Sequence, residues 1–80
     1  MKNCSRKDII MGLSKFEYMV KACDETTCSY KSLEMIDGYG NCLLSAIRYS
    51  EVKNKLSFIN DVLNIMMELD FKIAYHKFEF

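Results

Sequence analysis

The sequence predicts a small α+β domain, in which two helices pack on one face of a three-stranded antiparallel sheet in the order α-β-β-α-β. Two segments have apolar residues at helical spacing, and a glycine-rich turn between two short apolar runs is typical of a hairpin. A period-two run near the C-terminus predicts the third strand. An all-helical bundle is the alternative. The 80 residues are enough for one domain, residues 1–80, with a modest core.

The first element is a helix over about residues 6–22. Ser5 can cap its start, and Asp8 stands three residues later, as in a capping box. The apolar residues then alternate at spacings of four and three: Ile9, Leu13, Phe16, Val20 and Cys23. This spacing produces one buried stripe. Gly12 lowers the helix propensity and could admit a neighbouring backbone.

The middle of the chain predicts a hairpin with strands at about 30–36 and 42–49. The turn is Asp37-Gly38-Tyr39-Gly40-Asn41, which holds two of the three glycines. The flanking residues also have good helix propensity, for example Leu33, Met35, Leu44 and Ala46. This ambiguity keeps the all-helical alternative open.

A second helix is predicted over about 51–68, with Ser50 as its cap. Its expected buried stripe is Val52, Leu56, Ile59, Leu63 and Met66, widened by Phe58, Val62 and Met67. After Asp70 the alternation of Phe71, Ile73 and Tyr75 predicts the last strand.

Composition restricts the classes of function. Eleven Lys and Arg balance eleven Asp and Glu, whereas nucleic-acid binders usually carry a basic excess. No apolar run is long enough to span a bilayer, and the N-terminus does not look like a secretory signal. We therefore expect a cytoplasmic protein that contacts no membrane, in which the cysteines are reduced thiols: Cys4, Cys23, Cys28 and Cys42.

One segment carries a hint of enzyme chemistry. The run from Gly40 to Ile47, Gly-Asn-Cys-Leu-Leu-Ser-Ala-Ile, resembles the nucleophile segment of ovarian-tumour-type cysteine proteases. The resemblance implies Cys42 as a nucleophile activated by a histidine, and His76 is the only histidine. It covers roughly ten residues, Tyr39 stands where the family has Asp, and the family's domain is much longer than this chain. We therefore expect no enzyme, and a structural thiol at Cys42.

A metal site is weakly indicated by the cysteine spacing. Cys23 and Cys28 form a C-x4-C pair, which Cys4, Cys42 or His76 could complete. Structural zinc usually needs a second close pair, which the chain lacks. The prediction is no metal and no cofactor.

Surplus apolar surface is the strongest functional indication. In the predicted sheet, Leu43, Ile47 and Tyr49 share an uncovered face, and Tyr75, Phe78 and Phe80 follow near the C-terminus. Exposed apolar surface of this kind marks protein contacts. We predict a non-enzymatic protein–protein interaction module, acting as a homodimer or as an inhibitor or adaptor of a larger protein. As a short, single-domain chain without a catalytic set, it is similar to phage inhibitors of host defence systems, anti-CRISPR proteins included. The alternative is a nucleic-acid-associated regulator that uses the basic N-terminal helix with Lys2, Arg6 and Lys7.

Overall fold

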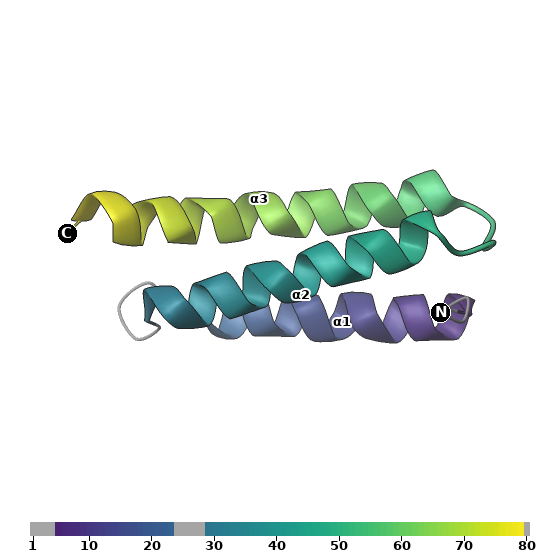
Figure 1. Ribbon diagram of the computed structural model, residues 1–80, viewed down its shortest axis with the longest axis horizontal. Helices are drawn as coiled ribbons and strands as arrows, with labels where there is room; N and C mark the ends of the chain where they lie inside the picture. Colours follow the sequence, from purple (N-terminus) through teal and green to yellow (C-terminus); the bar gives the residue numbers. More distant parts are fainter. Residues whose placement is uncertain (1–4, 24–28, 80) are drawn as a thin grey trace.

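The described residues form a three-helix bundle in which consecutive helices are antiparallel, so the first and third helices run in the same direction (Figure 1). A computed structural model describes residues 5–23 and 29–79, with side chains to residue 75. The helices are α1 (Arg6–Ala22), α2 (Tyr30–Arg48) and α3 (Lys55–Glu79), in a rod of 42 × 18 × 18 Å. The described residues contain no strand, so the predicted α+β sheet domain is wrong and the all-helical alternative is correct.

Helix α1 confirms its sequence prediction. It spans Arg6–Ala22, and its capping box is complete. The Ser5 hydroxyl accepts from the Asp8 backbone N–H at 3.2 Å, and the Asp8 carboxylate accepts from the Ser5 N–H at 3.2 Å. The predicted stripe faces the core: Leu13 is half-buried, and the buried members are Ile9, Phe16, Val20 and Cys23.

Helix α2 runs straight through the predicted hairpin turn. Neither Gly38 nor Gly40 has a positive φ, so neither serves a turn. Gly40 is buried, and a Cβ atom placed there would lie 2.5 Å from Cζ of Phe16. Gly12 of α1 faces Leu43 in the same way, at 2.9 Å. These two glycines let α1 and α2 approach closely, which is the physical reason that glycine occurs inside both helices.

The connection between α2 and α3 also differs from the prediction. Ser50 does not cap the following helix; it is buried, and its hydroxyl donates to the carbonyl of Ile47 at 2.7 Å. The Lys55 ammonium donates to the carbonyl of Arg48 at 3.0 Å. The first bond adds a second donor to the Ile47 carbonyl, which already accepts from the Ser50 backbone N–H at 3.2 Å, and the second supplies a donor to a carbonyl in the last turn of α2. The chain then turns through Asn54, at φ 62°, and α3 begins at Lys55.

Helix α3 has 25 residues and includes the segment predicted as a strand. Phe58, Val62 and Leu69 are its buried apolar residues, whereas Leu56 and Leu63 of the predicted stripe are exposed. The predicted stripe is therefore correct at Phe58 and Val62 and wrong at Leu56, Leu63 and Met67, which are exposed. Apolar residues lie on two opposite sides of α3, so their spacing alone does not identify the side that faces the core.

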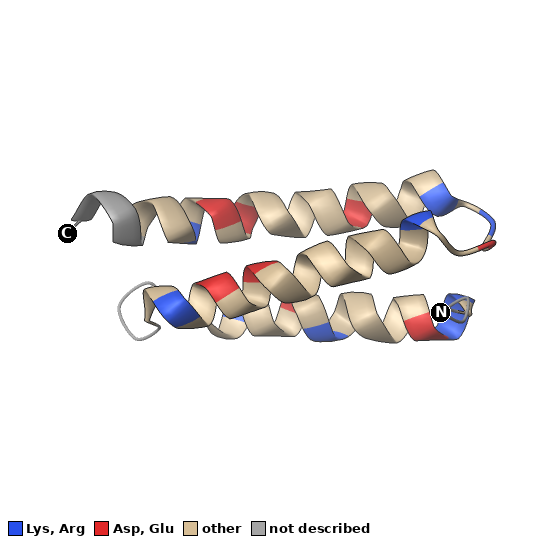
Figure 2. Ribbon diagram, in the orientation of Figure 1, with Lys and Arg blue, Asp and Glu red and all other residues tan. Residues whose placement is uncertain are grey.

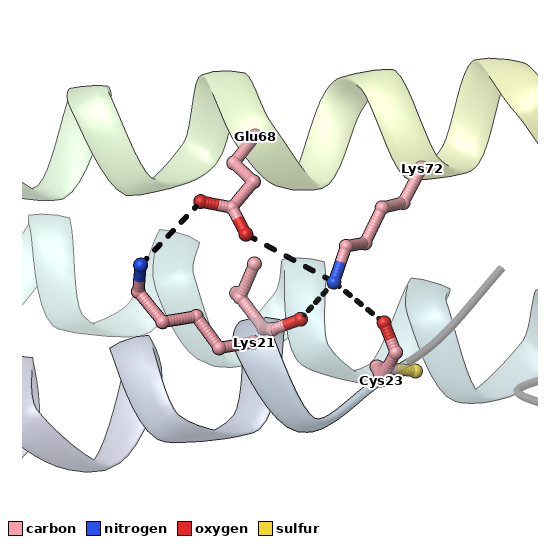
Figure 3. A network of polar contacts seen from close by, with 5 residues as sticks. Lys21, Cys23, Glu68 and Lys72 are labelled. Atoms are coloured by element: carbon pink, nitrogen blue, oxygen red, sulfur yellow. Dashed lines mark hydrogen bonds and ion pairs between the residues drawn. The ribbon is translucent and has the colours of Figure 1, made fainter.

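A buried lysine joins α3 to the end of α1 (Figure 3). The Lys72 ammonium donates to the carbonyls of Val20 and Cys23, at 2.5 and 2.6 Å. The Glu68 carboxylate lies 3.9 Å from Lys72 and 4.0 Å from Lys21. Lys72 thus adds a charged donor to the Val20 carbonyl, which also accepts from the Cys23 backbone N–H at 3.3 Å, and to the carbonyl of the C-cap residue Cys23.

Candidate protein-interaction surface

The side of α3 that points away from the core is apolar. Four large side chains expose much of their surface there: Leu56 (81%), Leu63 (47%), Met67 (59%) and Phe71 (74%). Spacings of seven and four residues place them on one side of a helix. That side is opposite the buried residues Phe58, Val62 and Leu69. We call the surface formed by Leu56, Asn60, Leu63, Met67, Asp70, Phe71 and Ala74 the outer face of α3.

The outer face is unusual for a helix packed on one side only. Such helices normally place charged and polar residues opposite the core, and a helix that is apolar all round is usually covered on all sides. In α3 the core side is covered by α1 and α2, and the outer face is exposed. Leaving four large apolar side chains in water forgoes about 1–2 kcal/mol of burial free energy for each.

The charges beside this surface are acidic (Figure 2). Between residues 56 and 71, α3 carries Asp61, Glu68 and Asp70 and no lysine or arginine. Glu68 is already paired with Lys21 and Lys72. A surface of this composition repels phosphate and suits an apolar partner.

A second apolar region is a groove of about 500 Å³ between α1 and α2. Tyr18 and Met35 stand at its sides, 73% and 71% exposed, and Met19, Ile36 and Tyr39 line it further. No residue of α3 lines this groove. The outer face of α3 is longer and more continuous, so we treat it as the main candidate site.

The partner-binding residues predicted from the sequence do not lie together. Ile47 is completely buried in the core, and Leu43 is half-buried against α1. Tyr49 is exposed just after α2, and Tyr75 is 46% exposed near the end of α3. The helical rise separates the start of α3 from Tyr75 by about 30 Å, so the two tyrosines lie toward opposite ends of the bundle. The side chains of Phe78 and Phe80 lie outside the described part of the chain.

The sequence of α3 contains a second spacing pattern, besides the core stripe, that corresponds to the outer face. Leu56, Leu63 and Asp70 are spaced by seven residues, and so are Asn60, Met67 and Ala74. A seven-residue repeat of mostly apolar residues, on the side of the helix opposite the core stripe, is the pattern that could have revealed it.

The cysteines do not form a recognisable catalytic or metal centre. Cys42 is a free, exposed thiol inside α2, twelve residues after the first residue of the helix. Cys23 is disulfide-bonded, unlike the reduced thiol expected. Cys4, Cys28 and the side chain of His76 lie outside the described part of the chain. The described residues include no group of three or more potential ligands that could hold a metal ion.

The described helices include none that is long and apolar enough to cross a lipid bilayer. No protein-family model, curated protein or solved structure matches the chain. The function is therefore inferred from the geometry of the bundle and its surfaces.

Proposed function

We propose that the protein is a non-enzymatic protein–protein interaction module that binds through the outer face of α3. The observation that carries the proposal is the exposure of Leu56, Leu63, Met67 and Phe71 on one side of a helix whose other side forms the core. Exposed apolar patches that exceed those of an ordinary monomer mark interaction sites, protein–protein contacts among them. A helix that lays its apolar side against another helix or in a groove is a common recognition mode.

A nucleic-acid regulator receives less support. The Arg6 guanidinium lies 5.4 Å from the centre of the Phe58 ring, where a cation–π contact holds it against the bundle. Lys7 is exposed, but Asp8 lies beside it, and Lys2 is outside the described residues. The acidic margin of α3 would oppose phosphate binding.

The proposal includes action in the cytoplasm, as a dimer or as an inhibitor or adaptor of a larger protein, a class to which phage anti-defence inhibitors belong. The exposed thiol of Cys42 fits a reducing compartment, whereas the disulfide at Cys23 fits an oxidising one. Rapid alkylation in living cells followed by mass spectrometry distinguishes the two. Four alkylated cysteines support the cytoplasm, and a retained disulfide contradicts it.

Site-specific photo-crosslinking tests the binding surface. A photoreactive amino acid replaces Phe71 in one variant and Ser45, which is exposed on α2, in the control. On irradiation in the native cell, we expect a covalent product with another polypeptide from position 71 and none from position 45. Equal products from both positions, or none from position 71, would contradict the proposal.

A further inference from the structure

We infer that the outer face of α3 binds the same face of a second copy of this chain, with the two α3 helices antiparallel. The inference rests on the proposed function and names its partner. It follows from the order of residues along the face, the area that they expose and the positions of the two polar residues among them.

The first step is the spacing. Leu56, Asn60, Leu63, Met67, Asp70 and Ala74 follow one another at intervals of four, three, four, three and four residues. This alternation is the seam of two helices that pack along their length, in which successive residues fill the spaces of the facing helix. Phe71 flanks the seam and is 74% exposed.

The second step is the symmetry of this order. A two-fold axis near residue 65 brings Leu56 beside Ala74 of the second copy, and Leu63 beside Met67. The same axis brings Asn60 beside Asp70, so the Asn60 amide can donate to the Asp70 carboxylate. The two polar residues thus meet each other, and the apolar residues meet apolar ones. A polar pair inside an otherwise apolar seam fixes register and orientation.

A parallel arrangement lacks this match. It would place Asp70 beside Asp70 of the second copy, two like charges close together in a partly desolvated interface. A shift of the antiparallel register by one seam position would set Asn60 and Asp70 against apolar residues. The antiparallel pairing about residue 65 is therefore the arrangement that the sequence of the outer face favours.

The third step is the apolar area that the outer face exposes and that a dimer would bury. The exposed fractions of Leu56, Leu63, Met67 and Phe71 correspond to about 500 Å² in each copy, or about 1,000 Å² in a dimer. Specific interfaces usually bury about 1,200–2,000 Å², and about 1,000 Å² is the least that indicates a biological interface. An interface near this lower bound is typical of weak, reversible association, so we expect a dissociation constant in the micromolar range.

Sedimentation equilibrium under reducing conditions tests the dimer, because reduction excludes a disulfide through Cys42. We expect a reversible monomer–dimer equilibrium for the natural chain. Leu63→Glu should weaken it at least tenfold, and Phe71→Ser should weaken it severalfold. Met35→Glu, an equally drastic change on the exposed side of α2, should leave it within twofold. Circular dichroism shows whether each variant is folded. If Leu63→Glu does not fold, Phe71→Ser alone tests the interface.

Two outcomes of that measurement would overturn the inference. One is a monomer at concentrations of several hundred micromolar, and the other is a dimer weakened by Met35→Glu but not by Leu63→Glu or Phe71→Ser. If the protein is monomeric and position 71 still cross-links to a different polypeptide in cells, the pairing is wrong and the proposed function stands. If position 71 cross-links to nothing, the proposed function fails as well.

Mixed disulfides test the orientation. Leu56→Cys and Ala74→Cys are placed in separate copies in which serine replaces all four natural cysteines. Antiparallel pairing predicts that mild oxidation of the mixture yields mainly the 56–74 heterodimer. A predominance of 56–56 and 74–74 products would show that the helices are parallel and overturn the arrangement.

Discussion

Two glycines that lie two residues apart in α2 give the sharpest prediction of the fold. Gly38 is exposed, and a Cβ atom added there meets nothing within 4 Å. Gly40 is buried against Phe16, and its added Cβ would lie 2.5, 2.9 and 3.1 Å from three ring atoms. Alanine should therefore stabilise the protein at position 38 and destabilise it at position 40.

The expected magnitudes follow from helix propensity and packing. Gly38→Ala removes the conformational cost of glycine in a helix, so the free energy of unfolding should rise by about 0.5–1 kcal/mol. Gly40→Ala gains up to about 1 kcal/mol of propensity but overpacks the site at a cost of about 3 kcal/mol, the upper end of the usual range. We choose that end because the Phe16 ring is completely buried and cannot move into solvent. The net loss should be about 2 kcal/mol.

Urea unfolding followed by circular dichroism measures both variants at one protein concentration. In thermal scans, Gly38→Ala should raise Tm by about 2–8 °C and Gly40→Ala should lower it by about 8–16 °C. Phe16→Leu should partly rescue Gly40→Ala, with a coupling of at least about 1 kcal/mol in a double-mutant cycle. If Gly38→Ala were as damaging as Gly40→Ala, both glycines would serve a turn and the continuous helix α2 would be refuted.

Three further predictions concern the junctions of the bundle and its thiol. Lys72→Met should lower the free energy of unfolding by about 1–3 kcal/mol, because the Val20 and Cys23 carbonyls lose a charged donor, whereas Glu68→Gln should cost less than about 1 kcal/mol. Urea unfolding compares the two variants, and equal losses would contradict the role of Lys72. Asn54 has a φ of 62°, so Asn54→Gly should leave the free energy of unfolding unchanged or raise it by up to about 1 kcal/mol, and Asn54→Val should lower it by more than about 1 kcal/mol. A valine variant as stable as the natural chain would argue against the positive φ. Cys42 should react with iodoacetamide at the rate of an ordinary exposed thiol. Mass spectrometry of a quenched time course measures this rate. A much faster reaction would support an activated nucleophile, as in the protease family that the segment resembles.

Helix α1 was predictable from sequence because its signals agree. The capping residues Ser5 and Asp8, the single apolar stripe and the polar remainder all indicate the same helix, and the structure has the predicted bounds. Helix propensity, capping and the apolar pattern all predict the same helix, so no signal contradicts another.

Helix α2 was mispredicted because glycine has two uses. Gly38 and Gly40 between apolar runs are typical of a turn, but Gly40 is required by the ring of Phe16 from a different helix. That contact joins residues 24 positions apart, so no local pattern contains it. The neighbouring residues have the helix propensity that the structure bears out, but the glycines led to the prediction of a hairpin.

Helix α3 was mispredicted because it has two apolar sides. The alternation of Phe71, Ile73 and Tyr75 resembles a strand, yet in the helix Phe71 lies on the outer face and Ile73 packs toward the core. For the same reason the expected core stripe contained Leu56 and Leu63, which belong to the outer face. The expectation of surplus apolar surface led to the present proposal, but the residues that carry it could be assigned only once the core side of α3 was known.

The central claim is that α3 has one side for the core and one for a second copy. A dilution series of ¹H–¹⁵N spectra, with leucine, methionine, phenylalanine and tyrosine amides assigned, tests it residue by residue. We predict concentration-dependent shifts at Leu56, Leu63, Met67 and Phe71, while Tyr18 and Met35 of the α1–α2 groove stay constant. A spectrum that does not change with concentration, or changes confined to the groove, would contradict the claim.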